Sequence, residues 1–205
     1  MRQSKRSPQQ LSPRLAPGQW VAIAMIVGIV LGQSRSFFLF DNGAGGSDWQ
    51  IGKPLITLGT AHQGRSLAES RALALQLVNR DRRLNGLKPL VEDPVLAEAA
   101  QRHAQDMLDR NFYDHVTPEG KTPSDRFAAL GGKGGAGENI MKMEGAAGVV
   151  LNFKLVEENQ KGWMYSPGHR ENLLLPDYTR FGYGIVVDSL RGRVYAVQNF
   201  SPPEP

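Results

Sequence analysis

The 205-residue sequence contains no cysteine. This absence excludes disulfide bonds, a thiolate nucleophile and cysteine-based metal sites. Acidic residues are missing from residues 1–40, where five basic residues stand without a counter-charge: Arg2, Lys5, Arg6, Arg14 and Arg35. The net charge of +4 therefore belongs to this N-terminal part, because after residue 40 the remaining 19 Lys and Arg meet 20 Asp and Glu. A nearly neutral folded part argues against nucleic acid as a partner, since phosphate binding needs basic residues gathered on one face.

Long hydrophobic runs are also scarce. Trp20–Gly32 is an uncharged apolar run that follows the basic stretch, and this order is typical of an export signal. It is shorter than the roughly 20 residues that span a bilayer as a helix. Three interpretations stay open: an uncleaved membrane anchor, a cleaved signal, or a buried core helix. The first two place the rest of the chain outside the cytoplasm, so we expect residues 1–40 to be a signal or membrane-anchor segment of an exported protein.

The rest of the chain divides into a linker and one domain. Residues 41–65 are rich in glycine and lack helical periodicity, which predicts a linker, and residues 66–201 form the expected domain. Apolar spacing and capping residues predict four helices: from Ser66 to Asn85-Gly86, after Asp93-Pro94, after Pro123, and over about Gly148 to Tyr165. Alternating β-formers predict a hairpin and one further strand: Phe181–Asp188 with Arg193–Phe200, and Asn139–Met143. Helices followed by an antiparallel hairpin indicate an α+β layered domain.

Two histidines and one carboxylate are the candidates for chemistry. His115 and His169 lie in segments that we interpret as turns, and Glu138 follows a glycine-rich loop. Two imidazoles can bind a divalent metal or transfer protons near neutral pH, and a carboxylate beside them would orient the rings. The spacing does not require the three side chains to meet, so a shared site and purely structural turn residues are both open.

Other features have plainer interpretations. His103 lies on the apolar side of the second predicted helix, where a packed histidine is favoured over a site residue. Residues 132–137 match a dinucleotide-binding glycine pattern, but the required strand before and helix after are in the wrong order. Ser166 lies three residues from His169, yet no third partner of a hydrolase triad is evident. Trp163 is expected to pack its helix on the sheet.

Several motifs together resemble the bacterial branch of the CAP superfamily (SCP-like domains), which includes cysteine-rich secretory proteins, venom antigens and plant pathogenesis-related proteins. They occur in the family's order: Leu87-Lys88-Pro89-Leu90, His115-Val116-Thr117-Pro118-Glu119-Gly120, Gly137-Glu138-Asn139-Ile140, Gly162-Trp163-Met164, Ser166-Pro167-Gly168-His169-Arg170 and Phe181-Gly182-Tyr183-Gly184. The resemblance implies a CAP-type three-layer α-β-α sandwich with an antiparallel sheet and a central cleft.

The resemblance also implies a site. In the family the cleft carries two histidines and two acids and can bind a divalent metal such as zinc. His115 and His169 match the histidines, and Glu138 matches the first acid. The second acid has no match: Tyr165 and Ser166 occupy its neighbourhood, and Glu157 or Glu158 is a candidate replacement. Asn139 is placed with the cleft residues.

Three functions follow as hypotheses. The first is a non-catalytic extracytoplasmic module that binds a lipid, glycan or peptide of the envelope, or a metal held by His115 and His169. The alternative is a metal- or histidine-assisted peptidase with Glu138 as general base. In the third hypothesis the domain is a structural envelope protein whose motif residues stabilise turns.

Overall fold

The computed structural model describes residues 46, 48–56 and 59–204. The predicted signal or anchor segment and the start of the predicted linker lie outside this part of the chain. Within it, no helix combines the length and apolar character needed to cross a membrane.

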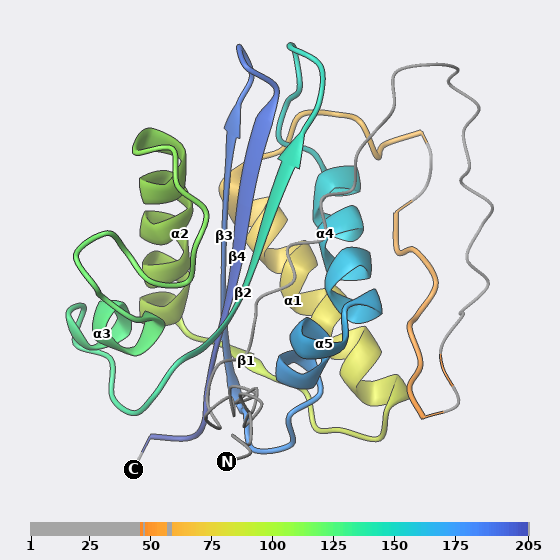
Figure 1. The fold of residues 1–205 in the computed structure, drawn as a ribbon. Helices are drawn as coiled ribbons and strands as arrows, with labels where there is room; N and C mark the ends of the chain where they lie inside the picture. Colours follow the sequence, from red (N-terminus) through yellow and green to blue (C-terminus); the bar gives the residue numbers. More distant parts are fainter. Residues whose placement is uncertain (1–45, 47, 57–58, 205) are drawn as a thin grey trace, which may run out of the picture. The chain divides into compact units, whose positions relative to one another are not determined.

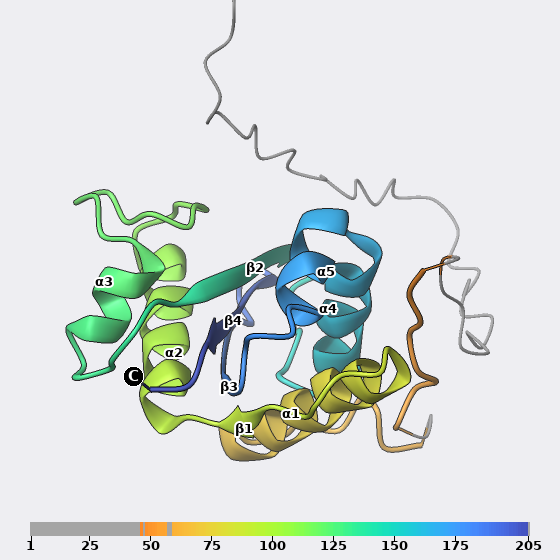
Figure 2. The same ribbon diagram turned by 90° about the horizontal axis from the view of Figure 1, so that it is seen from below.

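Helices cover both faces of a four-stranded sheet (Figure 1). The strands are β1 (Val91–Glu92), β2 (Gly137–Glu144), β3 (Arg180–Asp188) and β4 (Arg193–Ser201), in the order β1-β3-β4-β2. The helices are α1 (Leu67–Leu84), α2 (Pro94–Asp109), α3 (Pro123–Ala128), α4 (Phe153–Tyr165) and α5 (Pro167–Leu173). In Figures 1 and 2, α2 and α3 lie on one side of the sheet and α1, α4 and α5 on the other. This confirms the α-β-α sandwich.

The sheet is antiparallel over its three long strands. β4 pairs antiparallel with β3, which confirms the predicted hairpin, and also with β2, which contains the predicted strand Asn139–Met143. The short strand β1, which was not predicted from the sequence, pairs in parallel with β3. β2 is therefore an edge strand, and the carbonyl oxygens of Glu138 and Ile140 accept hydrogen bonds from side chains.

Capping residues account for the well-predicted helix starts. Ser66 and Glu69 form the expected capping box at α1, and Asp93 accepts the backbone N–H groups of Val95 and Leu96 at α2. Thr122 and Asp125 form a second capping box at α3. Each such cap satisfies helix N–H groups that have no partner within the helix.

Two helical boundaries differ from the prediction. α4 begins at Phe153 rather than Gly148, because the Asn152 side chain accepts the Leu155 N–H and caps the helix there. Gly148 lies in the preceding loop with a φ of 92°, a left-handed conformation that favours glycine. The segment Pro167–Leu173, interpreted as a turn, is the helix α5. Its proline is at the first turn, where a missing N–H costs nothing.

The position of α5 is fixed by a buried arginine. Arg82, on α1, is fully buried and donates to the carbonyl oxygens of Leu173 and Leu175 at 2.9 Å each. Its other donors reach the carbonyls of Lys88 and Tyr178. Carbonyls at a helix C-terminus carry partial negative charge and stabilise a cation. The guanidinium therefore fastens the C-terminal end of α5 to α1.

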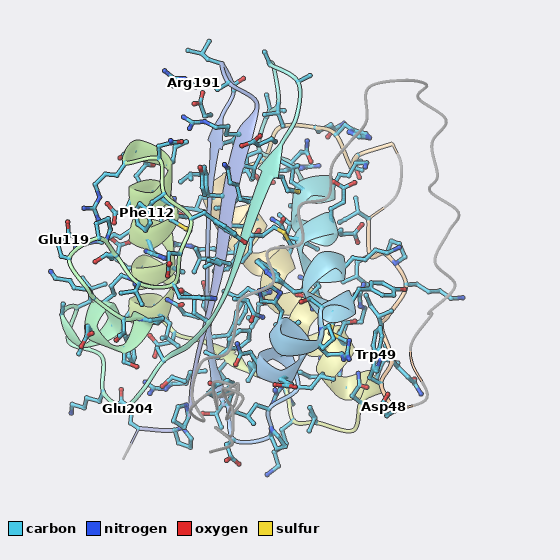
Figure 3. All side chains as sticks on the ribbon, viewed as in Figure 1. Asp48, Trp49, Phe112, Glu119, Arg191 and Glu204 are labelled. Carbon is cyan, nitrogen blue, oxygen red and sulfur yellow. The ribbon has the colours of Figure 1, made fainter. Side chains whose placement is uncertain are left out.

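The segment before Ser66 also contributes to the fold. Ile51 is buried in the main hydrophobic core, and Ala61 is also buried. Trp49, labelled in Figure 3, packs edge-on against Tyr165 with 5.4 Å between ring centroids. Residues of the predicted linker thus pack on the helical layer of α1 and α4.

Candidate functional site

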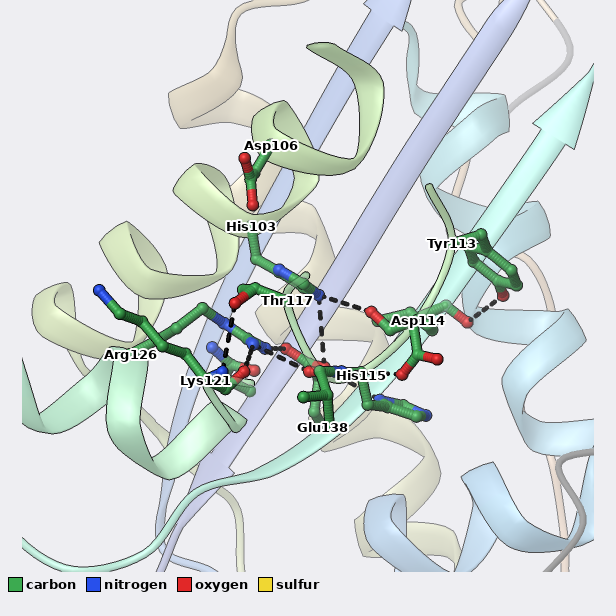
Figure 4. A network of polar contacts seen from close by, with 12 residues as sticks. His103, Asp106, Tyr113, Asp114, His115, Thr117, Lys121, Arg126 and Glu138 are labelled. Carbon is green, nitrogen blue, oxygen red and sulfur yellow. Dashed lines mark hydrogen bonds and ion pairs between the residues drawn. The ribbon is translucent and has the colours of Figure 1, made fainter. Parts of the chain in front are cut away.

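Glu138 is the centre of a compact polar site on β2 (Figure 4). Its side chain is only 1% exposed, and both carboxylate oxygens have partners. The Nδ1 atom of His115 lies 2.9 Å from Oε1, and Arg126 donates from Nη2 to Oε2 at 2.5 Å. The buried carboxylate is therefore balanced by a guanidinium on one side and oriented toward an imidazole on the other.

Arg126 holds the loop that carries His115. From α3, its Nη1 atom donates to the carbonyl oxygens of His115 at 2.8 Å and Lys121 at 3.0 Å. The same guanidinium binds Glu138, so one side chain joins the loop to the strand. Arg126 was not predicted from the sequence, because its role depends on two segments that meet only in the folded chain.

His103 lies behind the carboxylate. It is buried on α2, as predicted for a packed histidine, and its Nε2 atom lies 2.9 Å from the carbonyl oxygen of Asp114. Burial lowers the pKa of His103. A neutral ring can reach that carbonyl only by donating from Nε2, which assigns the proton to this nitrogen. Nε2 is also 3.8 Å from Oε1 of Glu138, so the packed histidine borders the site.

His115 presents one ring nitrogen outward. Its side chain is 42% exposed while its Nδ1 atom contacts the buried Glu138 carboxylate. A carboxylate accepts hydrogen bonds, so Nδ1 carries a proton and, in the neutral ring, Nε2 keeps its lone pair. In metal sites, a carboxylate beyond the ligands orients a metal-binding histidine in this same way.

His169 lies in a different environment. It is the third residue of α5, not a turn residue as predicted, and it is partly buried. Its Nδ1 atom lies 2.9 Å from the hydroxyl of Ser166, the residue that precedes the helix. Burial, with a smaller electrostatic contribution from the neighbouring His115, lowers the pKa of His169 to about 4. The ring is therefore neutral at physiological pH.

Side-chain amides join α5 to β2 beside Glu138. Asn139 donates to the carbonyl oxygen of His169 at 3.1 Å. Asn172 donates to the carbonyl oxygen of Glu138 at 3.1 Å and to Oδ1 of Asn139 at 2.9 Å. These bonds bring the His169 helix to the strand position that holds His115. The two histidines and the carboxylate thus come from three segments that meet at one end of β2.

Other candidates lie elsewhere. Tyr165 packs against Trp49. Glu157 accepts the backbone N–H groups of Leu55 and Ile56, and Glu158 pairs with Lys154, so neither supplies the second acid. Within the described residues, no group of three or more His, Asp or Glu side chains is arranged to hold a metal ion.

Two surface depressions in the described part of the chain lie away from these residues. One depression is lined by Asp188, Arg191 and Arg193, among others, and the second by residues that include Trp49 and Leu84. Neither depression is lined by His115, Glu138 or His169. These two depressions are therefore not the cleft that the family resemblance implies around His115, Glu138 and His169.

Comparison with known proteins identifies the domain. The sequence model of the CAP family, described as the cysteine-rich secretory protein family, matches residues 75–200. The chain belongs to the CAP family. All the residues of the polar site lie within the matched range.

Two bacterial proteins are similar in sequence to more than half of this chain. The Bacillus subtilis protein YkwD is 40% identical over 113 residues, which cover 55% of this chain and 40% of YkwD. The B. subtilis membrane protein YlbC is 35% identical over 126 residues, or 62% of this chain and 32% of YlbC. The chain thus matches well under half the length of each curated relative.

Solved structures agree with the fold. An extracellular protein from Bacillus anthracis that contains an SCP domain is 30% identical with a TM-score of 0.51, over 66% of this chain and 41% of that one. An outer surface protein from Borrelia burgdorferi, 17% identical, has a TM-score of 0.56 over 70% of this chain and 99% of that one. The second likeness concerns the fold alone.

Proposed function

We propose that this CAP domain is an extracytoplasmic binding module whose recognition groups are the imidazoles of His115 and His169, with a divalent cation such as zinc as a ligand. The observation that carries the proposal is the burial of the Glu138 carboxylate and its contact with Nδ1 of His115. The carboxylate fixes the proton of His115 on Nδ1, which leaves Nε2 as the outward-facing donor.

Two imidazole nitrogens suit a cation of borderline softness such as zinc, but two protein ligands give only modest affinity. Imidazole nitrogens are common zinc ligands, and His169 stays neutral because its pKa is lowered to about 4. With two protein ligands, the remaining coordination positions would be filled by water or by groups of a second ligand. Such a site is expected to bind zinc more weakly than a three- or four-ligand site.

Open coordination positions are also suited to an envelope ligand. A lipid headgroup, glycan or peptide with oxygen donors could complete the coordination of a metal held by His115 and His169. Similarity to an extracellular SCP-domain protein and the basic-then-apolar N-terminal pattern support export. Membrane attachment through the N-terminal segment is part of this proposal.

Binding is favoured over hydrolysis by the same carboxylate. A general base must reach the water that it deprotonates. Glu138 is 1% exposed, and its oxygens already accept from His115 and Arg126. The peptidase hypothesis assigned the base role to this residue, whereas its surroundings support an orienting role.

Calorimetric titration of the full chain with zinc tests the proposal. We expect a binding heat in the wild type that disappears in the His115→Ala/His169→Ala double variant. The matched control is His62→Ala, because His62 is an exposed histidine outside the site. Equal heats in the wild type and the double variant would reject the metal-binding function.

A further inference from the structure

A chain of buried amides crosses the core beneath the site. It begins at Asp81 on α1, whose Oδ2 accepts from Nε2 of Gln160 at 2.7 Å. Oε1 of Gln160 accepts from Gln198 at 2.9 Å, and Oε1 of Gln198 accepts from Asn139 at 3.3 Å. Asn139 then donates to the carbonyl oxygen of His169. The four side-chain groups lie in residues that are at most 1% exposed.

Every amide in this chain points the same way, and the two ends explain why. A carboxylate and a backbone carbonyl can only accept hydrogen bonds, whereas an amide both donates and accepts. Asp81 therefore requires the NH₂ of Gln160, which leaves the oxygen of Gln160 for the NH₂ of Gln198. The oxygen of Gln198 in turn requires the NH₂ of Asn139. The oxygen of Asn139 is then left to accept from Asn172.

Both carboxylate oxygens of Asp81 must accept hydrogen bonds. Oδ1 accepts the backbone N–H of Gly52 at 2.9 Å and Nε of Arg80 at 2.8 Å, and Oδ2 accepts Nη2 of Arg80 at 3.0 Å in addition to Gln160. All of these partners are donors, so both sides of Asp81 require an acceptor. An isosteric amide could satisfy only one side.

We infer that Asp81 is a positioning residue for the candidate site: its carboxylate sets the direction of the amide chain and thereby the orientation of Asn139, which holds α5 and His169 against β2. If residue 81 were an amide, it would keep its oxygen on Gly52 and Nε of Arg80, and its NH₂ would take the position of Oδ2, where it meets the donors of Gln160 and Nη2 of Arg80. Gln160 and Gln198 would each have to flip in turn. The conflict would reach Asn139, whose oxygen would then face the chain instead of Asn172.

This inference rests on the proposed function only in its prediction of a changed zinc affinity. The orientation of Asn139 is measurable without any ligand, through the side-chain NH₂ peaks of Asn139 and Gln198 in ¹H–¹⁵N spectra of the full chain. In the wild type we expect one sharp pair for each residue. In Asp81→Asn we expect shifted or doubled peaks at both positions, and zinc affinity lowered roughly tenfold, as for other groups that orient metal ligands.

A rescue variant tests whether the effect of Asp81→Asn comes from the direction of the hydrogen bonds or from altered packing at position 81. In the Asp81→Asn/Gln160→Glu protein, the new amide at position 81 keeps its oxygen on Gly52 and Arg80 and donates to the new carboxylate. That carboxylate again requires the NH₂ of Gln198, so the wild-type orientation returns at Gln198 and Asn139. We expect single peaks and near wild-type zinc affinity.

Glu157→Gln is the matched control. Glu157 also accepts N–H groups of the segment before Ser66, from Leu55 and Ile56, but it has no bond to the amide chain. It should lower the melting temperature without moving the Asn139 peaks. Unshifted Asn139 and Gln198 peaks in Asp81→Asn, or a rescue variant no closer to wild type than the single variant, would overturn the inference. If the wild type does not bind zinc, the proposed function fails. The amide peaks of Asn139 and Gln198 still decide whether Asp81 sets the orientation of Asn139.

Discussion

The two histidines of the site are the same residue type in opposite environments. His115 comes from an irregular loop, is 42% exposed and has a buried carboxylate as its partner. His169 comes from the first turn of a helix, is partly buried and has a hydroxyl as its partner. A carboxylate fixes the proton on Nδ1, whereas a hydroxyl can donate or accept and leaves the tautomer of His169 open. A charged partner thus orients one imidazole, while burial keeps the other neutral.

Removing the charge of Glu138, the partner that distinguishes His115 from His169, should have the largest effect on stability. Glu138→Gln leaves the guanidinium of Arg126, itself 10% exposed, without its counter-charge. Breaking a buried ion pair from one side costs about 3 kcal/mol of unfolding free energy. Urea unfolding measures the loss. The exposed Arg110–Glu119 pair gives the control, since Glu119→Gln should leave the midpoint almost unchanged. Similar midpoint shifts in both variants would contradict the central role of Glu138.

Lowering the pH should test the burial of His169. Its pKa is about 4 in the folded protein against 6.5 ordinarily. Between these values the unfolded chain binds a proton that the folded protein does not, so the unfolding free energy falls as pH drops from 6.5 toward 4. Above 6.5 the group contributes no pH dependence. We expect a loss of roughly 1–2 kcal/mol by pH 5, after allowance for partial solvent screening.

Variants assign that pH dependence to its source. His169→Gln should flatten the unfolding free energy measured in urea between pH 7 and pH 5. Burial also lowers the pKa of His103, which adds a dependence of the same sign, so His103→Gln is measured in parallel. An unchanged slope in His169→Gln would show that His169 is not buried as described.

The elements that these variants test differ in how far they could be predicted from the sequence. The helix starts at Ser66 and Asp93 were accessible because a cap and its partner are three residues apart or fewer, and Pro123 marked the start of α3 because proline is favoured in the first turn of a helix. The helix α5 was missed because Pro167-Gly168 has the composition of a turn. Its helical state depends on distant contacts, such as the Arg82 bond to the carbonyl of Leu173.

The site shows the same division. Motif resemblance selected His115, Glu138 and His169, and the fold brings these segments together at β2. The partners that define their chemistry were not accessible from the sequence. Arg126 looked like one of many basic residues, and nothing near Asp81 in the sequence indicates Gln160, which is 79 positions away. Such pairings arise from tertiary packing, which local patterns do not encode.

A carboxylate beside His169 should make the two histidines more alike. In Ser166→Asp the new side chain takes the place of the hydroxyl that lies 2.9 Å from Nδ1. It would fix the Nδ1 proton and free Nε2 as a donor, so we expect zinc to bind roughly tenfold more tightly in calorimetry. Ser189→Asp, at the exposed β3–β4 turn, adds the same charge away from the site. An equal gain in both variants would mean that net charge, not orientation, governs affinity.

The smallest expected effect concerns a carbonyl shared by the two sides of the site. The Ile140 oxygen accepts from the hydroxyl of Tyr113, in the His115 loop, and from Nε1 of Trp163, on α4, both at 3.1 Å. Tyr113→Phe leaves this carbonyl with the indole as its donor, so no buried acceptor loses its last partner. The loss of one neutral hydrogen bond should therefore cost about 0.5–1 kcal/mol of unfolding free energy.

Which histidine responds to Tyr113→Phe is more informative than the size of the stability loss. Tyr113 lies two residues from His115 and holds its loop to β2, whereas α5 is held by Asn139, Asn172 and Arg82. In imidazole NMR spectra, Tyr113→Phe should therefore broaden or shift the signals of His115 and leave those of His169 in place. Equal changes at both rings would mean that the loop and the helix respond as one rigid unit. Their separate anchoring to β2, on which the contrast between the two histidines depends, would then be wrong.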